Sequence, residues 1–432
     1  MVNVILTQQG DIRNIGEHAL LRSEIDFLNG VFKDVRVTVL TLYPERIRKV
    51  EPTIETYPPL IDLQTRGKNK LPLILYPFLL CFQTMLACIS LFLMKINLKP
   101  IYRPKVVEKF KHADLVISGG THAFMEGSMF QRGQTIIAKT INLFMLFWGA
   151  YEVFIVKKVL RKPFMTFPQS MGPFKSWIGK LAIKYILDNA DAILLREDYS
   201  LSLLEGVKGK APIYVAADMA FLFKGSSMSR RILPKPVIGV SPCFPHSFSQ
   251  KQQEDYVIAH SQLLDCMIEK HDVNVVFLPS VIGQGETEKR ESAKDDLEVC
   301  RMILQSMANK RKSEIACATT ADEFESLVEQ LDLLITTRMH PSILAAIKYV
   351  PFATIIYEHK QTGLLKKLGV EDTAIDINEV TFAKLRSRVE YIWNERMRIR
   401  HTLTLKIPAI QKETATTVKR VISMCLYDAK NS

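Results

Sequence analysis

Residues 331–346 read Leu-Asp-Leu-Leu-Ile-Thr-Thr-Arg-Met-His-Pro-Ser-Ile-Leu-Ala-Ala. An apolar run of strand length gives way to a polar turn and then to a Leu- and Ala-rich stretch, which predicts a buried strand, a short turn and a helix. We expect Pro341 at the first helical position, where its missing N–H costs no hydrogen bond. That helix start then presents free backbone N–H groups and a partial positive charge.

Arg338 and His340 stand immediately before this helix start. A guanidinium, an imidazole and a helix N-terminus together form an anion-binding site on physical grounds. The alternative is an arginine paired with a carboxylate and a histidine that caps a turn. We favour the site, because ligands of α/β sheets bind beyond the carboxyl ends of the strands.

The same alternation of short apolar runs and longer amphipathic stretches continues in both directions along the chain. Strands are expected at 2–7, 35–41, 114–118, 163–167, 192–195, 213–216, 237–241, 273–278, 315–318, 333–336, 352–356 and 374–377. Helices are expected at 17–29, 176–189, 251–270, 321–330, 341–349 and 381–400. Strands that alternate with helices predict parallel sheets covered on both faces, so the fold class is α/β.

The chain has 432 residues, which is too long for one ordinary core and sufficient for two. The segment 224–236 is rich in Gly, Ser and Pro and separates two groups of strands. We therefore expect two doubly wound, Rossmann-like α/β domains that face a cleft. The N-terminal domain covers residues 1–230 and the C-terminal domain covers residues 231–432.

Arg196 occupies a comparable place in the first domain. It follows the apolar run 192–195, and a helix is expected to begin at Asp198 or Tyr199. Each domain therefore has a strand end followed by a basic side chain, which makes Arg196 the second candidate anion ligand. The alternative is a surface ion pair with Glu197.

Two loops near the N-terminus complete the expected site. Asn14 and Gly16 follow the first strand, where Asn14 can cap a helix or contact a ligand and Gly16 permits a close backbone approach. Gly119 and Gly120 follow the strand at 114–118 and allow a tight turn against a ligand. The alternative is that these four residues form ordinary turns that contact no ligand.

The formal net charge is +12, which favours anionic partners such as phosphorylated substrates, acidic glycans or acidic lipid headgroups. The basic residues are scattered and carry no nucleic-acid-binding signature, so we expect no nucleic acid. The seven cysteines include no Cys-x-x-Cys pair, and the apolar N-terminus is too short for a signal peptide. We therefore expect reduced thiols and a cytoplasmic protein.

An apolar insert at about 71–100 departs from the α/β pattern. Its core, 71–94, contains no charged residue and has the length of a membrane span, but Pro72 and Pro77 weaken that interpretation. Basic residues flank it on both sides, which suits a segment lying on an anionic leaflet at the inner face of the plasma membrane. The alternative, equally open, is that 71–94 and a second apolar stretch at 141–156 form buried helices of the N-terminal core.

Several classes of enzyme are disfavoured. The chain has neither a Gly-x-Gly-x-x-Gly fingerprint nor a phosphate-binding P-loop, which argues against nicotinamide enzymes and P-loop ATPases. Pro168 stands where a nucleophile elbow would have its first glycine, so Ser170 is not expected to be a hydrolase nucleophile. No Asp-x-Asp and no zinc-like spacing occurs, and we expect neither a metal nor a cofactor.

Taken together and in order, these motifs resemble the polysaccharide pyruvyl transferase family. The resemblance extends from about residue 10 to about residue 370. The similar segments are Asn-Ile-Gly-Glu-His-Ala-Leu at 14–20, Ser-Gly-Gly-Thr at 118–121, Pro-Gln-Ser-Met-Gly-Pro at 168–173, Leu-Leu-Arg-Glu-Asp-Tyr-Ser at 194–200, the run from Arg338 to Phe352, and Ile-Tyr-Glu-His-Lys at 356–360.

The resemblance implies a glycosyltransferase-B-like fold and the transfer of pyruvate from phosphoenolpyruvate, a co-substrate, to a sugar of a polysaccharide or lipid-linked glycan as a ketal. It implies that the second domain binds the donor and that Arg196, Arg338, His340 and Lys360 contact it. His340 is the best candidate acid, because a histidine pKa can lie near neutrality. The base is unassigned between His122 and Asp218. The insert at 71–94 is unlike the family pattern and raises the question of a lipid-linked acceptor.

Two other functions remain open at this stage. A glycosyltransferase of the same fold would use Arg338 and His340 to hold the diphosphate of a nucleotide sugar. A membrane-associated glycan-assembly protein would keep the fold and the anion site without catalysis.

Overall fold

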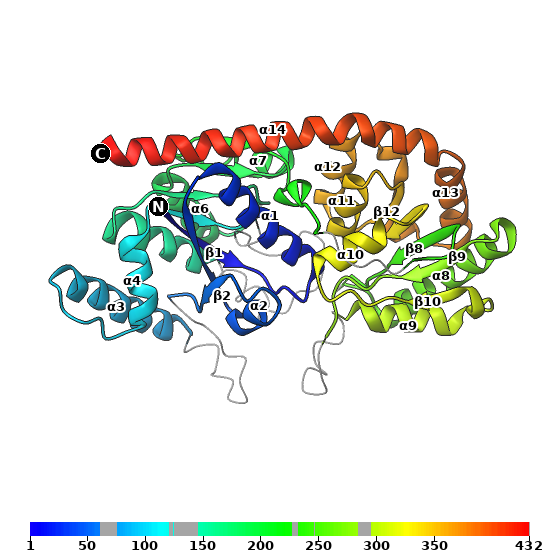
Figure 1. The fold of residues 1–432 in the computed structure, drawn as a ribbon, viewed down its shortest axis with the longest axis horizontal. Helices are drawn as coiled ribbons and strands as arrows, with labels where there is room; N and C mark the ends of the chain where they lie inside the picture. Colours follow the sequence, from blue (N-terminus) through cyan, green and yellow to red (C-terminus); the bar gives the residue numbers. More distant parts are fainter. Residues whose placement is uncertain are drawn as a thin grey trace.

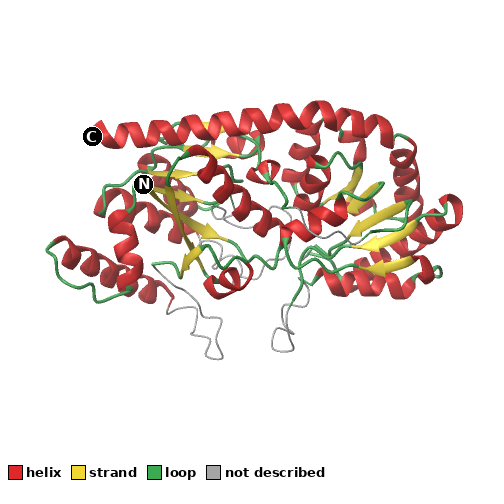
Figure 2. Ribbon diagram, in the orientation of Figure 1, coloured by secondary structure: helices red, strands yellow, loops and turns green. Residues whose placement is uncertain are grey.

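The structure is a computed structural model that describes residues 1–60, 76–120, 124, 146–226, 232–245, 247–283 and 295–431. Two groups of strands lie side by side, each covered by helices, as Figures 1 and 2 show. All the paired strands within each sheet run parallel. The protein is therefore an α/β protein with two parallel sheets, as the sequence predicted.

The first sheet has the order β3-β2-β1-β4-β5. Its strands are β1 (Val2–Gln9), β2 (Val35–Thr41), β3 (Glu55–Tyr57), β4 (Leu115–Ser118) and β5 (Phe164–Thr166). The short pair β6 (Ile193–Leu195) and β7 (Ile213–Val215) continues beyond β5 through parallel bridges from Met165 to Ala192 and from Gln169 to Leu195. The strand order reverses between β1 and β4, which is where doubly wound sheets bind ligands.

The second sheet has the order β10-β9-β8-β11-β12-β13, which is the Rossmann order 3-2-1-4-5-6. Its strands are β8 (Val237–Ser241), β9 (Asn274–Phe277), β10 (Ser313–Ile315), β11 (Leu333–Thr336), β12 (Phe352–Ile356) and β13 (Ala374–Asp376). Here the order reverses between β8 and β11, so the turn after β11 lies at the switch point. The proposed division near residue 230 falls between the two sheets and stays a prediction.

Helices cover both sheets. Those before β8 are α1 (Ile15–Val31), α2 (Pro44–Val50), α3 (Tyr76–Lys95), α4 (Pro104–His112), the π-helical turn η2 (Ile155–Val159), α6 (Trp177–Asn189), α7 (Asp198–Leu204) and the 3-10 turn η3 (Met219–Leu222). Those after β8 are α8 (Gln250–His271), α9 (Asp296–Ser306), α10 (Ala321–Val328), α11 (Met339–Ile347), α12 (His359–Leu368), α13 (Phe382–Asn394) and α14 (Arg396–Asn431).

Four details differ from the sequence predictions. The strand expected at 315–318 lies earlier, at Ser313–Ile315, and β3 was not expected at all. The region 381–400 belongs to two helices, α13 and α14. Helix α11 begins at Met339, so Pro341 is its third residue and His340 lies inside the first turn, with Arg338 as the N-cap residue.

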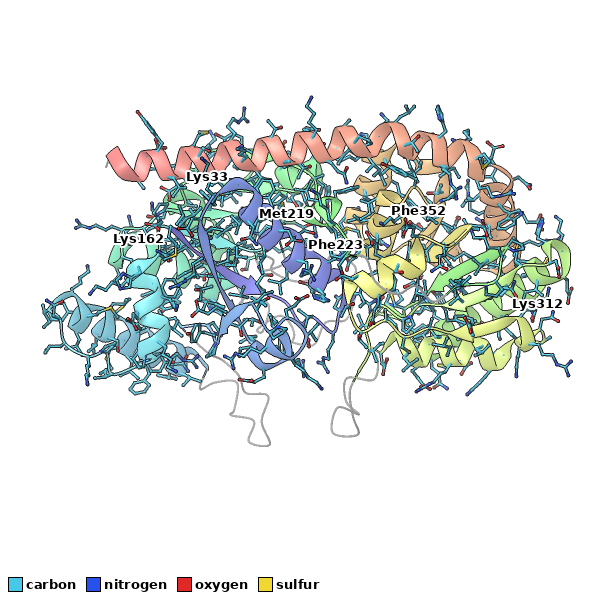
Figure 3. The ribbon with its side chains drawn as sticks, in the orientation of Figure 1. Lys33, Lys162, Met219, Phe223, Lys312 and Phe352 are labelled. Carbon is cyan, nitrogen blue, oxygen red and sulfur yellow. The ribbon has the colours of Figure 1, made fainter. Side chains whose placement is uncertain are left out.

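Helix α14 joins the two halves of the molecule, the first built around the sheet that contains β1 and the second around the sheet that contains β8. It is 36 residues long and passes along one side over both sheets (Figure 1). Its Gln411 and Thr414 form hydrogen bonds with the backbone of Phe221 and Ala217, at 2.8 and 3.2 Å. Figure 3 places Met219 and Phe223 near the middle of the molecule, where they are buried between the halves.

The apolar insert contains α3, which packs against α4 and η2. Ala87, Leu91 and Met94 on one side of α3 are buried in the core. Within the ranges that the structure describes, none of the helices has both the length and the apolar character that a membrane span requires. The outer side of α3 is exposed, so the segment is only partly core.

Candidate active site

Arg338 caps α11 at the end of β11 and is held there by a carboxylate. Its Nε and Nη2 donate to the two oxygens of Asp296 at 2.6 and 2.7 Å, and Asp296 is buried as the first residue of α9. Although burial acts against the charge, the Asp296 carboxylate holds the pKa of Arg338 well above its usual range. The pairing that was the alternative for Arg338 is therefore present, and it fixes the guanidinium at the strand end.

Arg196 lies at the end of β6 and is buried, with a side chain only 2% exposed. Its Nε donates to Oγ of Ser170 at 2.7 Å, and its Nη1 donates to Oδ2 of Asp218 at 2.7 Å. Glu197 is farther away, at 3.5 Å from Nε. Arg196 is thus a buried, oriented cation, and its ion pair with Glu197 is buried rather than on the surface.

Asp218 lies between Arg196 of the first half and His340 of the second. Its Oδ2 accepts the hydrogen bond from Arg196 and lies 3.8 Å from Nε2 of His340. Its Oδ1 accepts from the backbone N–H of Ala220 at 2.9 Å and so caps η3. Asp218 was one of two candidate bases, but its oxygens are occupied by Arg196 and the helix cap, which suits an orienting carboxylate better.

His340 is half-buried and faces the first half of the molecule. A Cβ atom on Gly16 would lie 2.2 Å from its Nδ1, so only a glycine fits beside the ring. Its Nε2 is buried without a hydrogen-bond partner. Burial, with a smaller contribution from Arg196 and Lys360, lowers the pKa of His340 to about 4 against the opposing attraction of Asp218.

The low pKa changes the expected role of His340. At neutral pH its imidazole carries no charge in the ligand-free protein, whereas the sequence suggested a group that holds a proton near neutrality. A neutral imidazole with an unpartnered ring nitrogen is suited to accept a proton.

Glu17 is the residue that the sequence analysis missed. Burial raises its pKa to about 7, even though Arg196 and Lys360 act in the opposite direction. Its Oε2 is buried without a hydrogen-bond partner and lies 2.3 Å from where a Cβ atom on Gly10 would stand. A carboxyl group that still holds its proton near neutral pH therefore lies among the cations of the site.

The sequence contained a signal for Glu17, but an ambiguous one. Glu17 is the third residue of α1 after the cap Asn14, which is the position of the glutamate in a helix capping box. In the structure Asn14 does accept from the N–H of Gly16 at 3.0 Å, whereas Glu17 turns toward the site. In the sequence, Glu17 could therefore be read as a capping residue alone, although it is also a candidate functional residue.

Lys360 approaches the site from α12. Its Nζ pairs with Glu358 at 2.5 Å, and its side chain is 19% exposed. His359, the residue before Lys360, stacks on Tyr199 with ring centroids 4.7 Å apart, which brings α12 against α7. The charge of Lys360 acts on both His340 and Glu17, which places it within the same cluster.

The remaining candidates have structural contacts. Asn14 caps α1 and bridges to Val281 of the other half. Gly119 and Gly120 are buried against Gln9 and Glu24, where a Cβ atom on Gly119 would lie 2.0 Å from Nε2 of Gln9.

Electrostatic interactions link Arg196, Arg338 and Lys360 to His340, and Gly16 lies against the His340 ring. The Gly119–Gly120 turn is connected to this cluster through Glu24, which accepts from the N–H of Gly120 and interacts with Glu17 and Asp218. The buried neighbours of the Gly119–Gly120 turn are Gln9 and Glu24. His122, the other candidate base, lies outside the described residues. In the described part of the chain no group of His, Cys, Asp or Glu side chains has the geometry of a metal site.

Two doubly wound sheets with a basic site between their switch points define a glycosyltransferase-B-like protein. Solved structures with a similar fold include UDP-GlcNAc 2-epimerase of Neisseria meningitidis bound to UDP-GlcNAc, with a TM-score of 0.53, 8% identity and coverage of 98% of this chain and 99% of that one. Another is S. aureus MnaA with UDP, with a TM-score of 0.55, 11% identity and coverage of 94% and 91%. At these identities the likeness shows the fold alone.

The sequence identifies the family. The pattern described as polysaccharide pyruvyl transferase matches residues 14–359, and the chain belongs to this family of transferases. A relative is the amylovoran biosynthesis protein AmsJ of Erwinia amylovora, which is 22% identical over 417 residues, covering 90% of this chain and 91% of AmsJ. Arg196, Arg338 and His340 all fall within the matched range.

Proposed function

We propose that this protein transfers pyruvate from phosphoenolpyruvate to a sugar of a glycan and forms a cyclic ketal. The observation that supports the proposal most strongly is the cluster of Arg196, Arg338 and Lys360, which come from both halves and lie around the half-buried imidazole of His340. Phosphoenolpyruvate carries a phosphate and a carboxylate, and two arginines and a lysine match these two anionic groups. The family to which the chain belongs supports the same reaction.

The donor would bind at the start of α11. The Nη1 of Arg338 takes no part in the pair with Asp296, and it extends from a guanidinium that is 23% exposed. The N-terminus of α11 adds backbone N–H groups and a partial positive charge. Two of the five N–H groups of Arg196 are already bound to Ser170 and Asp218, so we assign this residue to the electrostatic field of the site rather than to the first contact with the donor.

The chemistry needs two proton-transfer groups. One proton is added to the methylene carbon, two C–O bonds form at the central carbon, and the bond from that carbon to the phosphate oxygen breaks. Two acceptor hydroxyls lose one proton each. One of these protons is balanced by the new C–H bond, and the other leaves with the phosphate.

Glu17 and His340 fit these two roles. The pKa values of about 7 and about 4 leave the carboxyl group partly protonated and the imidazole neutral at pH 7. A bound trianionic donor raises both pKa values, which keeps the proton on Glu17 and makes His340 a stronger base. We therefore assign Glu17 as the acid toward the methylene carbon and His340 as the base toward the acceptor hydroxyl.

The acceptor belongs to the same proposal. The relationship to AmsJ, which is described as an amylovoran biosynthesis protein, supports a bacterial exopolysaccharide or cell-envelope glycan as the product. The exposed apolar side of α3 supports an acceptor that is linked to a lipid at a membrane. The protein would then act at the cytoplasmic side, where phosphoenolpyruvate is available.

A nucleotide-sugar glycosyltransferase is the second candidate, because the solved structures with UDP or UDP-GlcNAc share the fold. In that case the basic cluster would hold a diphosphate. Binding of the two ligand classes separates the candidates.

Isothermal titration calorimetry with phosphoenolpyruvate tests the proposal directly. Arg338→Lys is the informative variant, because it keeps a cation opposite Asp296 and removes the forked geometry. We expect the wild type to bind and the variant to bind about tenfold or more weakly. Lys384→Arg, which likewise exchanges one cation for another at an exposed ion pair with Glu379, serves as the charge-matched control and should bind like the wild type. A wild type that binds a uridine diphosphate sugar and not phosphoenolpyruvate would contradict the proposal.

A further inference from the structure

One side of α3 exposes a continuous row of large apolar side chains. The spacing is alternately four and three residues, which places the row along one face of the helix. The exposed fractions range from 38% to 71%. The members of the row are Phe78, Phe82, Met85, Ile89 and Phe92.

The opposite side of α3 anchors the helix to the rest of the protein. Ala87, Leu91 and Met94 are buried, and Oγ of Ser90 accepts a hydrogen bond from the N–H of Tyr102 at 2.8 Å. At the end of the helix Lys95 donates to the carbonyl of Val159 at 2.9 Å. The exposed row is therefore the outer surface of a helix that is fixed in the fold.

The apolar surface continues beyond the helix. Ile96, Leu98 and Ile101 are 51%, 55% and 63% exposed. Such an extended row is unusual on a surface that meets only water, because monomeric soluble proteins rarely expose large contiguous apolar patches. Figure 1 shows α3 at one end of the molecule, away from α14 and the second sheet, so no part of the described fold covers the row.

The charges around the row indicate which kind of partner binds to it. Residues 76–107 contain no Asp or Glu, whereas the exposed Lys95, Lys99 and Lys105 lie at the end of α3, in the segment after it and at the start of α4. Lys158, on η2 beside the end of α3, is exposed as well. In a symmetric pair of copies these basic ends would meet one another or find no acidic partner on α3, which disfavours self-association through this face.

An anionic membrane matches both the exposed apolar row and the lysines around it. Phenylalanine side chains enter the boundary between headgroups and acyl chains, and adjacent lysines are attracted to acidic headgroups. A 20-residue helix that lies flat offers about 30 Å of contact along the surface. We propose that the outer face of α3, from Phe78 to Phe92 and continuing to Ile101, docks the protein on an anionic lipid bilayer.

This proposal does not depend on the pyruvyl transfer reaction. It explains why α3 is apolar on both sides: one side packs on the protein and the other meets lipid. It also resolves the two alternatives for 71–94, because for α3 each alternative describes one side of the same helix.

Flotation of the purified full-length protein with vesicles tests the proposal. The vesicles are phosphatidylcholine alone or phosphatidylcholine mixed with phosphatidylglycerol. We expect binding to the mixed vesicles that is at least about tenfold stronger than to phosphatidylcholine alone and that weakens as salt is raised. Failure of the wild type to bind the mixed vesicles would overturn the proposal.

The decisive variant is the double change Phe82→Glu and Phe92→Glu, because both side chains are exposed and should be replaceable without unfolding. Its matched control is Ile258→Glu with Leu405→Glu, which introduces two carboxylates at positions 50% and 64% exposed on α8 and α14. We expect the first variant to lose vesicle binding at least about tenfold and the control to retain it. Circular dichroism and thermal unfolding establish that both are folded.

Two further measurements separate lipid docking from other occupants. Lys99→Glu with Lys158→Glu should weaken binding to the mixed vesicles several-fold and leave the weak binding to phosphatidylcholine unchanged. Light scattering after gel filtration gives the molar mass without lipid. A wild-type dimer that Phe82→Glu and Phe92→Glu converts to a monomer would show that α3 is a contact between copies and would overturn the proposal.

Discussion

A Cβ atom on Gly16 would lie 2.2 Å from Nδ1 of His340, so the start of α1 and the imidazole on α11 are in direct contact across the two halves of the molecule. The same junction contains a hydrogen bond from the N–H of Ile15 to the carbonyl of Ser280 at 2.9 Å. The position of His340 therefore depends on how closely the first half approaches the second. Glu17 is the next residue of α1, so its position in the site depends on the same contact between the two halves.

Gly16→Ala should reduce kcat/KM by about 100-fold, because the added methyl group displaces the imidazole from its place near Asp218. Gly30→Ala on the same helix is the control, since nothing lies within 4 Å of its Cβ position. This control should keep full activity and gain about 0.5–1 kcal/mol in stability, as alanine is the better helix former. Steady-state kinetics and urea unfolding of both variants provide the measurements. Equal activities of the two variants would refute the importance of the contact.

The activity should depend on pH through Glu17 and His340. If Glu17 acts protonated and His340 acts neutral, kcat/KM falls as pH rises above about 7 and as it drops below about 4. Glu17→Gln should lower kcat about 100-fold or more and remove the alkaline limb from the residual activity. Glu379→Gln, at a half-exposed carboxylate in the second half, should leave the profile unchanged. An alkaline limb that persists in Glu17→Gln would assign that limb to another group.

Asp296 should orient Arg338 and also support the loop that contacts the first half. Its Oδ2 accepts from the N–H of Val281 at 3.0 Å as well as from Arg338. Asp296→Asn should therefore cost about 3 kcal/mol of stability, because it breaks a buried ion pair, and should weaken donor binding about tenfold. Asp295→Asn is the matched control: Asp295 caps α9, and asparagine caps equally well. Urea unfolding and calorimetry would show no difference between the two variants if the ion pair were unimportant.

Glu24 should make the stability of the protein depend on pH. Burial raises its pKa to about 8 in the folded state, from an ordinary value of 4.5, although Gly120 and Gln9 donate hydrogen bonds to it. The folded state thus binds this proton more tightly than the unfolded state. The associated stability is complete below about pH 4.5 and is lost as pH rises toward 8.

Glu24→Gln removes this titration. Between pH 5 and pH 9 the wild type should lose on the order of 4 kcal/mol relative to the variant. Urea unfolding at several pH values measures the difference, with Glu413→Gln on the exposed side of α14 as the control. Parallel pH dependences of wild type and Glu24→Gln would show that Glu24 keeps an ordinary pKa.

The sequence predicted the sheets well because their strands are short, apolar and separated by helical patterns. β11 and α11 were predicted from one run, and the structure shifts the helix two residues toward the N-terminus, from 341–349 to 339–347. β3 escaped prediction because it has three residues, Glu-Thr-Tyr, which carry no apolar pattern. Strand pairing with β2, rather than local preference, makes it a strand.

The charge state of the site could not be derived from the sequence. The pattern around Arg338 and His340 indicated an anion site, but the pKa of His340 depends on burial against Gly16, more than 300 positions away. Glu17 resembled a capping residue, and its raised pKa results from tertiary burial. Residue types were readable in the sequence, whereas the pKa values of His340 and Glu17, on which the proposed exchange of the acid role rests, depend on the folded neighbourhood.

Helix α14 has a consequence for how the chain folds during synthesis. Val418, Val421, Ile422 and Cys425 are buried, and the helix contacts β5 and η3, which belong to the first half of the chain. The N-terminal half leaves the ribosome first but cannot cover this apolar surface until the last residues of α14 have been translated. A nascent chain that stops after α13 should therefore recruit holdase chaperones, and release from them should coincide with emergence of the segment from Thr414 to Cys425.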